Sequence, residues 1–161
     1  ADAPCAAYRL PTAAEWMSAA LHTTAGDVSW AAAVADTQPV CWGCGPGEDG
    51  TAPTRVASQP ANPAGLYDMA GNVGEWCQDW LDVTAYGLCG KDDVQHDPQG
   101  PSRSYDPQHP YEKRRAQRGG SFLCTDEYCG RYRPSARQGS TEDTGMSHTG
   151  FRCVQDAAPL D

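Results

Sequence analysis

The chain has 161 residues, a length suited to one domain, and carries a formal net charge of −9 with a pI near 4.7. Such an acidic surface repels phosphate backbones and anionic lipids, which excludes nucleic acid and anionic membranes as partners. The 17 glycines, 13 prolines and only 2 phenylalanines predict a loop-rich domain with a modest core. No apolar run reaches membrane-spanning length, and the 8 cysteines favour an oxidising, extracytoplasmic location.

The first predicted element is a helix from Ala13 to about His22. Thr12 suits the N-cap position and Glu15 stands three residues later, which together form a capping box. Trp16 and the alanines at 19 and 20 share one helical face. We therefore expect a short helix that carries these residues on one face.

Two cysteine pairs follow whose partners the sequence leaves open. Cys41 and Cys44 form a Cys-x2-Cys pair in a turn-rich loop, compatible with half a zinc site, a redox motif or a local disulfide. No second pair of that spacing follows, which favours a structural bridge. Cys77 and Cys89 flank a short segment and could form another bridge, but connectivity cannot be read from spacing.

The segment 62–80, NPAGLYDMAGNVGEWCQDW, combines carboxylates with glycine-rich backbone. Asp68 and Glu75 are hard oxygen ligands, and the backbone between them can turn carbonyls onto the same ion. Calcium binding is one interpretation, and two solvated acids beside a turn is the other. Trp76 and Trp80 are four residues apart, which predicts a helical turn with both rings in the core.

The middle and the end of the chain give weaker signals. Residues 90–118 are hydrophilic and proline-rich, so a long surface excursion is expected there, with 112–115 (EKRR) as a solvated patch. Residues 150–154 (GFRCV) predict a core strand.

The segment 118–137, RGGSFLCTDEYCGRYRPSAR, places Cys124 and Cys129 five positions apart. The residues between them favour a turn, which would let the two sulfurs converge. Two thiolates held across a short turn make a soft, low-coordinate site that suits Cu(I). A structural disulfide closing a small loop fits the same spacing, so the residues alone leave both interpretations open.

This segment resembles the C-terminal core of the formylglycine-generating enzymes, also called sulfatase-modifying factors. The resemblance rests on the block Gly-Gly-Ser-aromatic-x-Cys-x4-Cys-x-Arg-Tyr-Arg and on the Gly-Phe-Arg-Cys sequence near the end of the chain. Residues 9–16 (RLPTAAEW) and 65–76 (GLYDMAGNVGEW) resemble two further family segments. In the family RLPT lies near the middle of the catalytic domain, so the resemblance implies that a second chain or a separate piece supplies the N-terminal half.

The resemblance implies an α+β, C-type-lectin-like fold in one domain over residues 1–161. It implies a copper-dependent oxidase that uses O2 to convert a peptidyl cysteine in an unfolded sulfatase segment to Cα-formylglycine. By position, Cys124 and Cys129 would bind Cu(I), and Ser121 would polarise the oxygen species. The implied substrate contacts are Tyr128, Arg137 and His148.

The resemblance also implies structural metal and disulfide sites. The implied calcium ligands are Asp68, Gly71, Val73 and Glu75, with Asp49 on a second calcium ion. A disulfide is implied between Cys5 and Cys153. The second bridge of the family is absent, because Pro134 stands at its position.

Three residues depart from the family pattern. Gly74 replaces a tryptophan, Thr125 stands where histidine is frequent, and His148 replaces an asparagine. The alternative function is therefore a non-catalytic binding module on the same calcium-stabilised scaffold, which needs the Cys-x4-Cys pair only as a disulfide. Related iron enzymes that make sulfoxides require a His-x3-His-x-Glu set, and this sequence has none.

Overall fold

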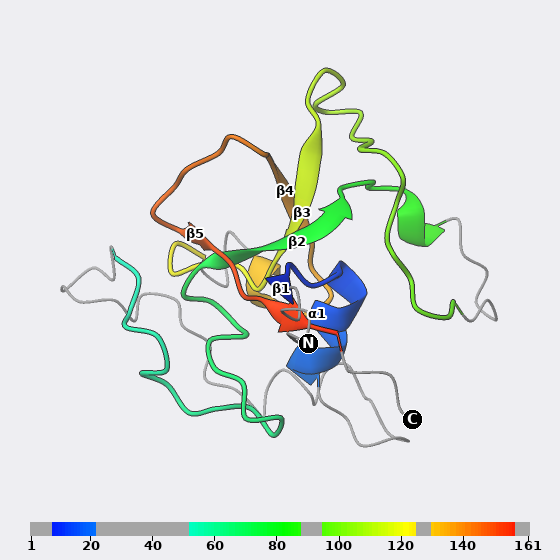
Figure 1. The fold of residues 1–161 in the computed structure, drawn as a ribbon. Coiled ribbons are helices and arrows are strands. Elements are labelled where there is room, and N and C mark those ends of the chain that lie inside the picture. Colours follow the sequence, from blue (N-terminus) through cyan, green and yellow to red (C-terminus); the bar gives the residue numbers. More distant parts are fainter. Residues whose placement is uncertain (1–7, 22–51, 88–94, 125–129, 157–161) are drawn as a thin grey trace, which may run out of the picture.

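The structure, a computed structural model, describes residues 8–21, 52–87, 95–124 and 130–156. The elements within these ranges are, in chain order, β1 (Tyr8–Arg9), α1 (Ala13–Leu21), β2 (Gly74–Trp80), the 3-10 turn η1 (Ala85–Gly87), β3 (Arg114–Arg118), the 3-10 turn η2 (Gly130–Tyr132), β4 (Gln138–Thr141), β5 (Thr149–Gly150) and β6 (Val154–Gln155). Much of the described chain lies outside these elements, in irregular segments (Figure 1). The described chain is thus an α+β, loop-rich fold, as predicted. Among the described residues, no helix has the length and apolar content needed to cross a bilayer.

A four-stranded sheet in the order β4-β3-β2-β5 forms the centre of the fold. β2 and β4 both pair antiparallel with β3, whereas β5 runs parallel to β2 and places Thr149 opposite Gly74. β1 and β6 form a separate antiparallel pair. The parallel pairing matters for the site because it brings the C-terminal part of the chain beside the start of β2.

Helix α1 begins at the predicted capping box. Thr12 Oγ1 accepts the N–H of Glu15 at 3.0 Å, and Glu15 Oε2 accepts the N–H of Thr12 at 2.7 Å. A carboxylate from β2 adds a second cap, because Asp79 Oδ2 accepts the N–H of Ala13 at 2.7 Å. The helix ends at Leu21, one residue before the expected boundary.

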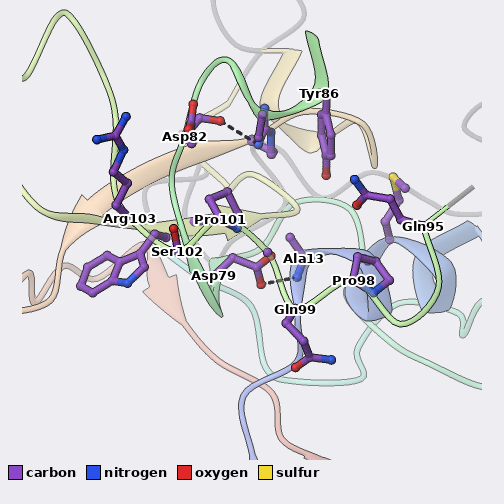
Figure 2. A pocket seen from close by; sticks show the side chains of 17 residues that line it. Ala13, Asp79, Asp82, Tyr86, Gln95, Pro98, Gln99, Pro101, Ser102 and Arg103 are labelled. Atoms are coloured by element: carbon purple, nitrogen blue, oxygen red, sulfur yellow. Dashed lines mark hydrogen bonds between the residues drawn. The ribbon is translucent and has the colours of Figure 1, made fainter. Parts of the chain in front are cut away.

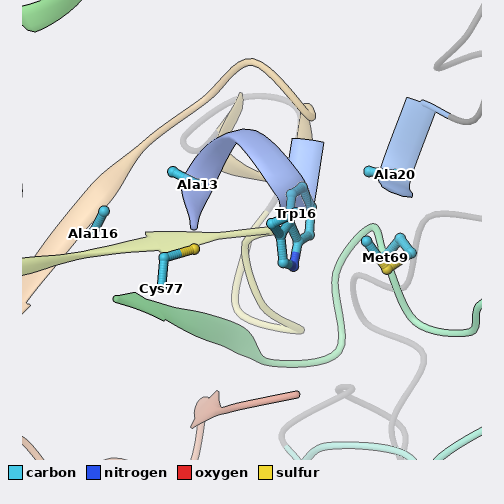
Figure 3. Close-up of a cluster of buried hydrophobic side chains, with 6 residues drawn as sticks. All are labelled: Ala13, Trp16, Ala20, Met69, Cys77 and Ala116. Atoms are coloured by element: carbon cyan, nitrogen blue, oxygen red, sulfur yellow. The ribbon is translucent and has the colours of Figure 1, made fainter. Parts of the chain in front are cut away.

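The core lies between α1 and one face of the sheet. Figure 3 shows its members, which are Ala13, Trp16, Ala20, Met69, Cys77 and Ala116. Along β2, Glu75, Cys77 and Asp79 are buried while the residues between them are only partly buried, as a period of two requires. Trp16 is 1% exposed and lies in this core.

The expected helical turn at Trp76 and Trp80 is wrong. Both residues belong to strand β2 and are only partly buried. A spacing of four places two side chains on one side of a strand as well as of a helix, so the spacing could not distinguish them. Arg115 covers the ring of Trp80 at 3.7 Å and pairs with Glu142 at 2.8 Å, so the 112–115 segment is not simply a solvated patch.

The C-terminal segment also differs from the expected core strand. β5 ends at Gly150, and β6 begins only at Val154. Phe151 between them is 68% exposed.

Candidate functional site

The segment 119–124 bends sharply because its two glycines have left-handed backbone conformations. Gly119 and Gly120 have φ of 86° and 66°. A Cβ on Gly120 would lie 2.6 Å from the backbone nitrogen of Tyr132, so close an approach that only glycine fits. The bend thus lets the chain turn back against η2.

Two backbone hydrogen bonds join this bend to the loop before β2. The N–H of Gly71 donates to the carbonyl of Gly119 at 2.7 Å, and the N–H of Phe122 donates to the carbonyl of Asn72 at 2.9 Å. Phe122 is itself buried. The predicted calcium loop and the predicted copper segment are therefore directly connected.

Ser121 and Cys124 form one tight, buried turn. The N–H of Cys124 donates to the carbonyl of Ser121 at 2.9 Å, and the N–H of Ser121 lies 3.5 Å from Cys124 Sγ. The hydroxyl Oγ of Ser121 accepts the N–H of Leu123 at 3.3 Å. Cys124 is only 4% exposed. The turn therefore offers its sulfur a backbone donor and shields it from water.

Cys124 is disulfide-bonded in the structure. Its partner lies outside the described residues, because the other two described cysteines, Cys77 and Cys153, are free. Cys129, Tyr128 and Thr125 lie in the segment 125–129, also outside the described residues. A second sulfur thus adjoins Cys124, and reduction of that bond would leave two neighbouring thiols.

The other predicted bridges are not formed by the described cysteines. Cys77 is free and fully buried, and burial raises the pKa of its thiol to about 12, so a bridge to Cys89 is absent. Cys153 is free and exposed, which disagrees with the bridge to Cys5 that the resemblance implies. Cys5, Cys41, Cys44, Cys89 and Asp49 lie outside the described residues.

Two of the departures from the family pattern meet at one place. The N–H of Gly74 donates to the carbonyl of His148 at 2.8 Å. A Cβ on Gly74 would lie 2.7 Å from Gln138 Nε2, so the Gln138 amide occupies the space where a side chain at position 74 would begin. Gln138 is held there by Arg131, whose Nη1 donates to Gln138 Oε1 at 3.0 Å.

Arg137 lies in a different environment from the Ser121–Cys124 turn. Its guanidinium stacks on the ring of Tyr86 at 3.9 Å, and its Nη1 donates to the carbonyl of Asp82 at 3.1 Å. It lines a cavity to which neither Ser121 nor Cys124 contributes (Figure 2). The structure therefore does not bring the described candidate residues together around one centre.

The loop before β2 presents oxygen atoms that lack hydrogen-bond partners. Asp68 has a φ of 58°, and its Oδ2 accepts the N–H of Ala57 at 2.9 Å, while its buried Oδ1 has no partner. The carbonyls of Gly71 and Val73 accept no hydrogen bond from the described part of the chain. Ca²⁺ prefers carboxylate and carbonyl oxygens as ligands. This loop fits a calcium ion at Asp68.

Glu75 has partners that the sequence did not predict. Its Oε2 accepts Trp16 Nε1 at 2.6 Å and Arg152 Nε at 2.5 Å, and its Oε1 accepts Arg152 Nη2 at 2.7 Å. One acceptor position on Oε1 remains for a cation, since a carboxylate oxygen can accept two bonds. No cluster of three or more His, Cys, Asp or Glu side chains suited to a metal occurs among the described residues, so a calcium ion here needs the backbone carbonyls.

Comparison with known proteins identifies the family of this chain. Residues 3–157 match the sulfatase-modifying factor enzyme 1-like domain. The formylglycine-generating enzyme of Streptomyces coelicolor is 39% identical over 166 residues, covering 94% of this chain and 48% of its own length. The chain belongs to the formylglycine-generating enzyme, or sulfatase-modifying factor, family.

Two solved structures resemble the fold. Treponema denticola variable protein 1 has a TM-score of 0.61 and 29% identity, covering 91% of this chain and 46% of its own. CarF has a TM-score of 0.55 and 26% identity, covering 97% of this chain and 50% of its own. The predicted C-type-lectin-like fold is confirmed. The chain spans about half the length of each of these relatives.

Proposed function

We propose that this chain carries the cysteine-bearing part of a formylglycine-generating oxidase, which converts a peptidyl cysteine of a sulfatase to Cα-formylglycine with O2. The observation that supports this function best is the buried Ser121–Cys124 turn, in which a sulfur already adjoins a second sulfur. The 39% identity to a formylglycine-generating enzyme favours the same activity.

The residues fit a Cu(I) ion once the disulfide is reduced. Cys124 and Cys129 would be its two thiolate ligands, and the bound ion would supply a soft centre for the substrate thiolate and for O2. The N–H of Ser121 stabilises negative charge on Cys124 Sγ, which favours the thiolate. Since the hydroxyl of Ser121 accepts from Leu123, its own proton is available for donation to the reacting oxygen. Tyr128 would line the substrate site.

Calcium would stiffen the loop that supports this turn. Asp68, Gly71, Val73 and Glu75 would hold the ion, through the oxygens that lack partners and the remaining acceptor position of Glu75. Because Gly71 and Asn72 bond to Gly119 and Phe122, an ordered loop holds the Ser121–Cys124 turn in place. Asp49 would serve a second calcium ion.

The proposed partners follow from the same chemistry and from the length of the chain. The substrate is an unfolded sulfatase-type peptide, and the N-terminal half of the family domain comes from another polypeptide segment or a second chain. An extracytoplasmic location agrees with a disulfide at Cys124.

The test is to incubate the protein, reduced and supplied with Cu(I) and O2, with a peptide containing Cys-x-Pro-x-Arg. The peptide is expected to lose its thiol and gain an aldehyde, detected by mass spectrometry and hydrazide trapping. Cys124→Ser should abolish both aldehyde formation and tight Cu(I) binding. The matched control is Cys153→Ser, which removes an exposed free thiol and should leave both unchanged.

The alternative is a non-catalytic binding module, and one observation favours it. Gly74 lacks the aromatic side chain of the family, and the Gln138 amide occupies the adjacent space. Under this alternative the Cys124 disulfide is purely structural. Failure of the reduced protein to bind Cu(I) would exclude the two-thiolate copper site and favour the alternative.

A further inference from the structure

A cavity of about 560 Å³ lies between the N-terminal end of α1, the end of β2 and the segment 95–103 (Figure 2). This volume is within the range of small-ligand sites, roughly 300–1,000 Å³. Its lining includes aliphatic groups, among them Met17, Pro98 and Pro101, beside charged ones. Because Ser121 and Cys124 do not line it, the cavity is separate from the proposed copper site.

A chain of contacts holds the Arg137 guanidinium at this cavity. Arg118 is 1% exposed and is anchored through Nη1 to the carbonyls of Pro134 and Ala136, at 2.9 and 3.1 Å. Its Nη2 donates to the hydroxyl of Tyr86 at 2.7 Å, and the ring of Tyr86 carries Arg137 at 3.9 Å. Arg137 is thus prepositioned by stacking, and it does not depend on a counter-ion to be ordered.

The donors of Arg137 are incompletely used. A guanidinium has five N–H groups, and within the described residues Arg137 donates only to the carbonyl of Asp82 and forms no ion pair. Burial lowers its pKa, because desolvation of the guanidinium outweighs the attraction of the nearby Asp82 and Asp79 carboxylates. A half-buried guanidinium with unused N–H groups offers hydrogen-bond donors that a ligand can satisfy.

The two carboxylates of the cavity act on Arg137 through their charge, but the hydrogen bonds that they accept come from other groups. Asp79 accepts the N–H of Ala13, and the backbone of Gly100 lies against it so closely that a Cβ there would overlap the carboxylate. Asp82 Oδ1 accepts both the N–H and the hydroxyl of Thr84, at 2.8 and 2.6 Å. Arg137 is therefore a half-buried cation of the cavity with donors to spare, whereas Arg103 in the same lining is exposed.

We propose that this cavity binds a carboxylate carried on a short aliphatic stem, with Arg137 as the bidentate partner and the Met17–Pro98–Pro101 wall against the stem. Planar pairing of guanidinium with carboxylate gives charge-assisted hydrogen bonds about twice as strong as neutral ones. The carboxylate can belong to an acidic side chain of a polypeptide or to a small free acid. This site does not require the copper chemistry.

Isothermal titration calorimetry of the full 161-residue chain tests the proposal. The probes are N-acetyl-glutamate α-amide, its neutral isostere N-acetyl-glutamine α-amide, and butyrate. We expect at least one acid to bind about tenfold more tightly than the neutral isostere. Tighter binding of the glutamate derivative assigns a polypeptide side chain, and tighter binding of butyrate assigns a small acid.

The variants distinguish the effect of the planar Arg137 guanidinium from the effect of positive charge in general. Arg137→Gln should remove the preference for the acids, and Arg137→Lys should restore only part of it because an ammonium lacks the planar fork. Arg103→Gln is the matched control, since it removes an exposed positive charge from the same lining and should change affinity less than about twofold. If Arg137→Gln fails to fold, as judged by circular dichroism, Arg137→Lys carries the comparison. Equal binding of all three probes, or equal losses in Arg103→Gln and the Arg137 variants, would overturn the proposal.

Discussion

Glu75 of β2 and Arg152 of the C-terminal segment form a two-pronged ion pair, with Arg152 Nε 2.5 Å from Oε2 and Nη2 2.7 Å from Oε1. Trp16 of α1 donates to the same carboxylate at 2.6 Å, and Arg152 also donates to the carbonyl of Tyr67 at 2.9 Å. Glu75 is 5% exposed. One buried carboxylate therefore connects the helix, the central strand and the segment after β5.

Arg152→Met should destabilise the protein by about 3 kcal/mol, because it leaves Glu75 buried without its counter-charge. Urea unfolding followed by tryptophan fluorescence measures the change. The double variant Glu75→Gln/Arg152→Met should recover most of the loss, since it removes both charges. A loss below about 1 kcal/mol in the single variant, the size of a surface pair, would show that this ion pair is solvated.

Chelation of calcium should lower the melting temperature of the protein. A ligand at 100 times its Kd stabilises the native state by about 2.7 kcal/mol, provided that it binds only the folded chain. Asp68→Asn should reduce this shift, because asparagine tolerates the positive φ and can accept from Ala57 but lacks the charge. Asp97→Asn is the control, as Asp97 is exposed and also has a positive φ. An unchanged melting temperature on chelation would leave the Asp68 oxygen without its proposed cation.

Gly120→Ala should be more destabilising than Gly65→Ala. Both glycines have positive φ, so each substitution costs about 1 kcal/mol of backbone strain. At position 120 the new Cβ would also lie 2.6 Å from the backbone nitrogen of Tyr132, whereas position 65 has no atom within 4 Å. Thermal unfolding compares the two, and Gly120→Ala should additionally weaken Cu(I) binding because it displaces the Ser121–Cys124 turn. Equal effects of the two substitutions would mean that η2 moves away without cost.

The elements that the sequence predicted correctly depend on local contacts. The capping box of α1 involves residues three apart, so Thr12 and Glu15 could be paired from spacing alone. The glycines at 119 and 120 likewise indicate a bend. The family motifs then gave the fold class and the order of the site segments.

The features that the sequence did not predict depend on contacts between residues that are distant in the chain. Arg152 is 77 residues from Glu75, and no spacing rule connects them. The meeting of Gly74 with His148 follows from the parallel pairing of β2 with β5, which only the folded sheet determines. The spacing of Trp76 and Trp80 does not distinguish a strand from a helical turn, because both structures place residues four apart on one side.

Gly74→Ala should be only mildly destabilising, by about 1 kcal/mol or less, because the atom in its way is the end of a flexible side chain. The new Cβ would lie 2.7 Å from Gln138 Nε2, so Gln138 must move and lose its bond to Gln117 Oε1, now 3.2 Å. The Gln138→Ala background supplies the control, in which Gly74→Ala should cost less. A larger cost in that background would indicate that Gln138 is not the obstacle. Thermal denaturation of wild type, Gly74→Ala, Gln138→Ala and the double variant completes this double-mutant cycle.

The Arg9–Glu15 ion pair at the start of α1 should make the stability of the protein depend on pH. The side-chain hydrogen bond from Arg9 lowers the pKa of Glu15 from 4.5 to about 2. A carboxyl whose folded pKa is depressed stabilises the native state above its unfolded pKa, and this stabilisation is lost as the pH falls through 4.5 towards 2. Wild type should therefore be more stable than Glu15→Gln near pH 7, and the difference should vanish near pH 2.

Solvent limits the size of that difference, because the two side chains are 31% and 37% exposed. We expect less than about 1 kcal/mol near pH 7, and less again in 1 M salt. The control is Arg9→Met, in which Glu15→Gln should cost little at either pH because the ion pair is already gone. Urea titrations of wild type, the two single variants and the double variant at pH 7 and pH 2 measure the coupling energy between Arg9 and Glu15. A pH-independent difference between wild type and Glu15→Gln would mean that the glutamate acts only as a neutral hydrogen-bond acceptor in the capping box.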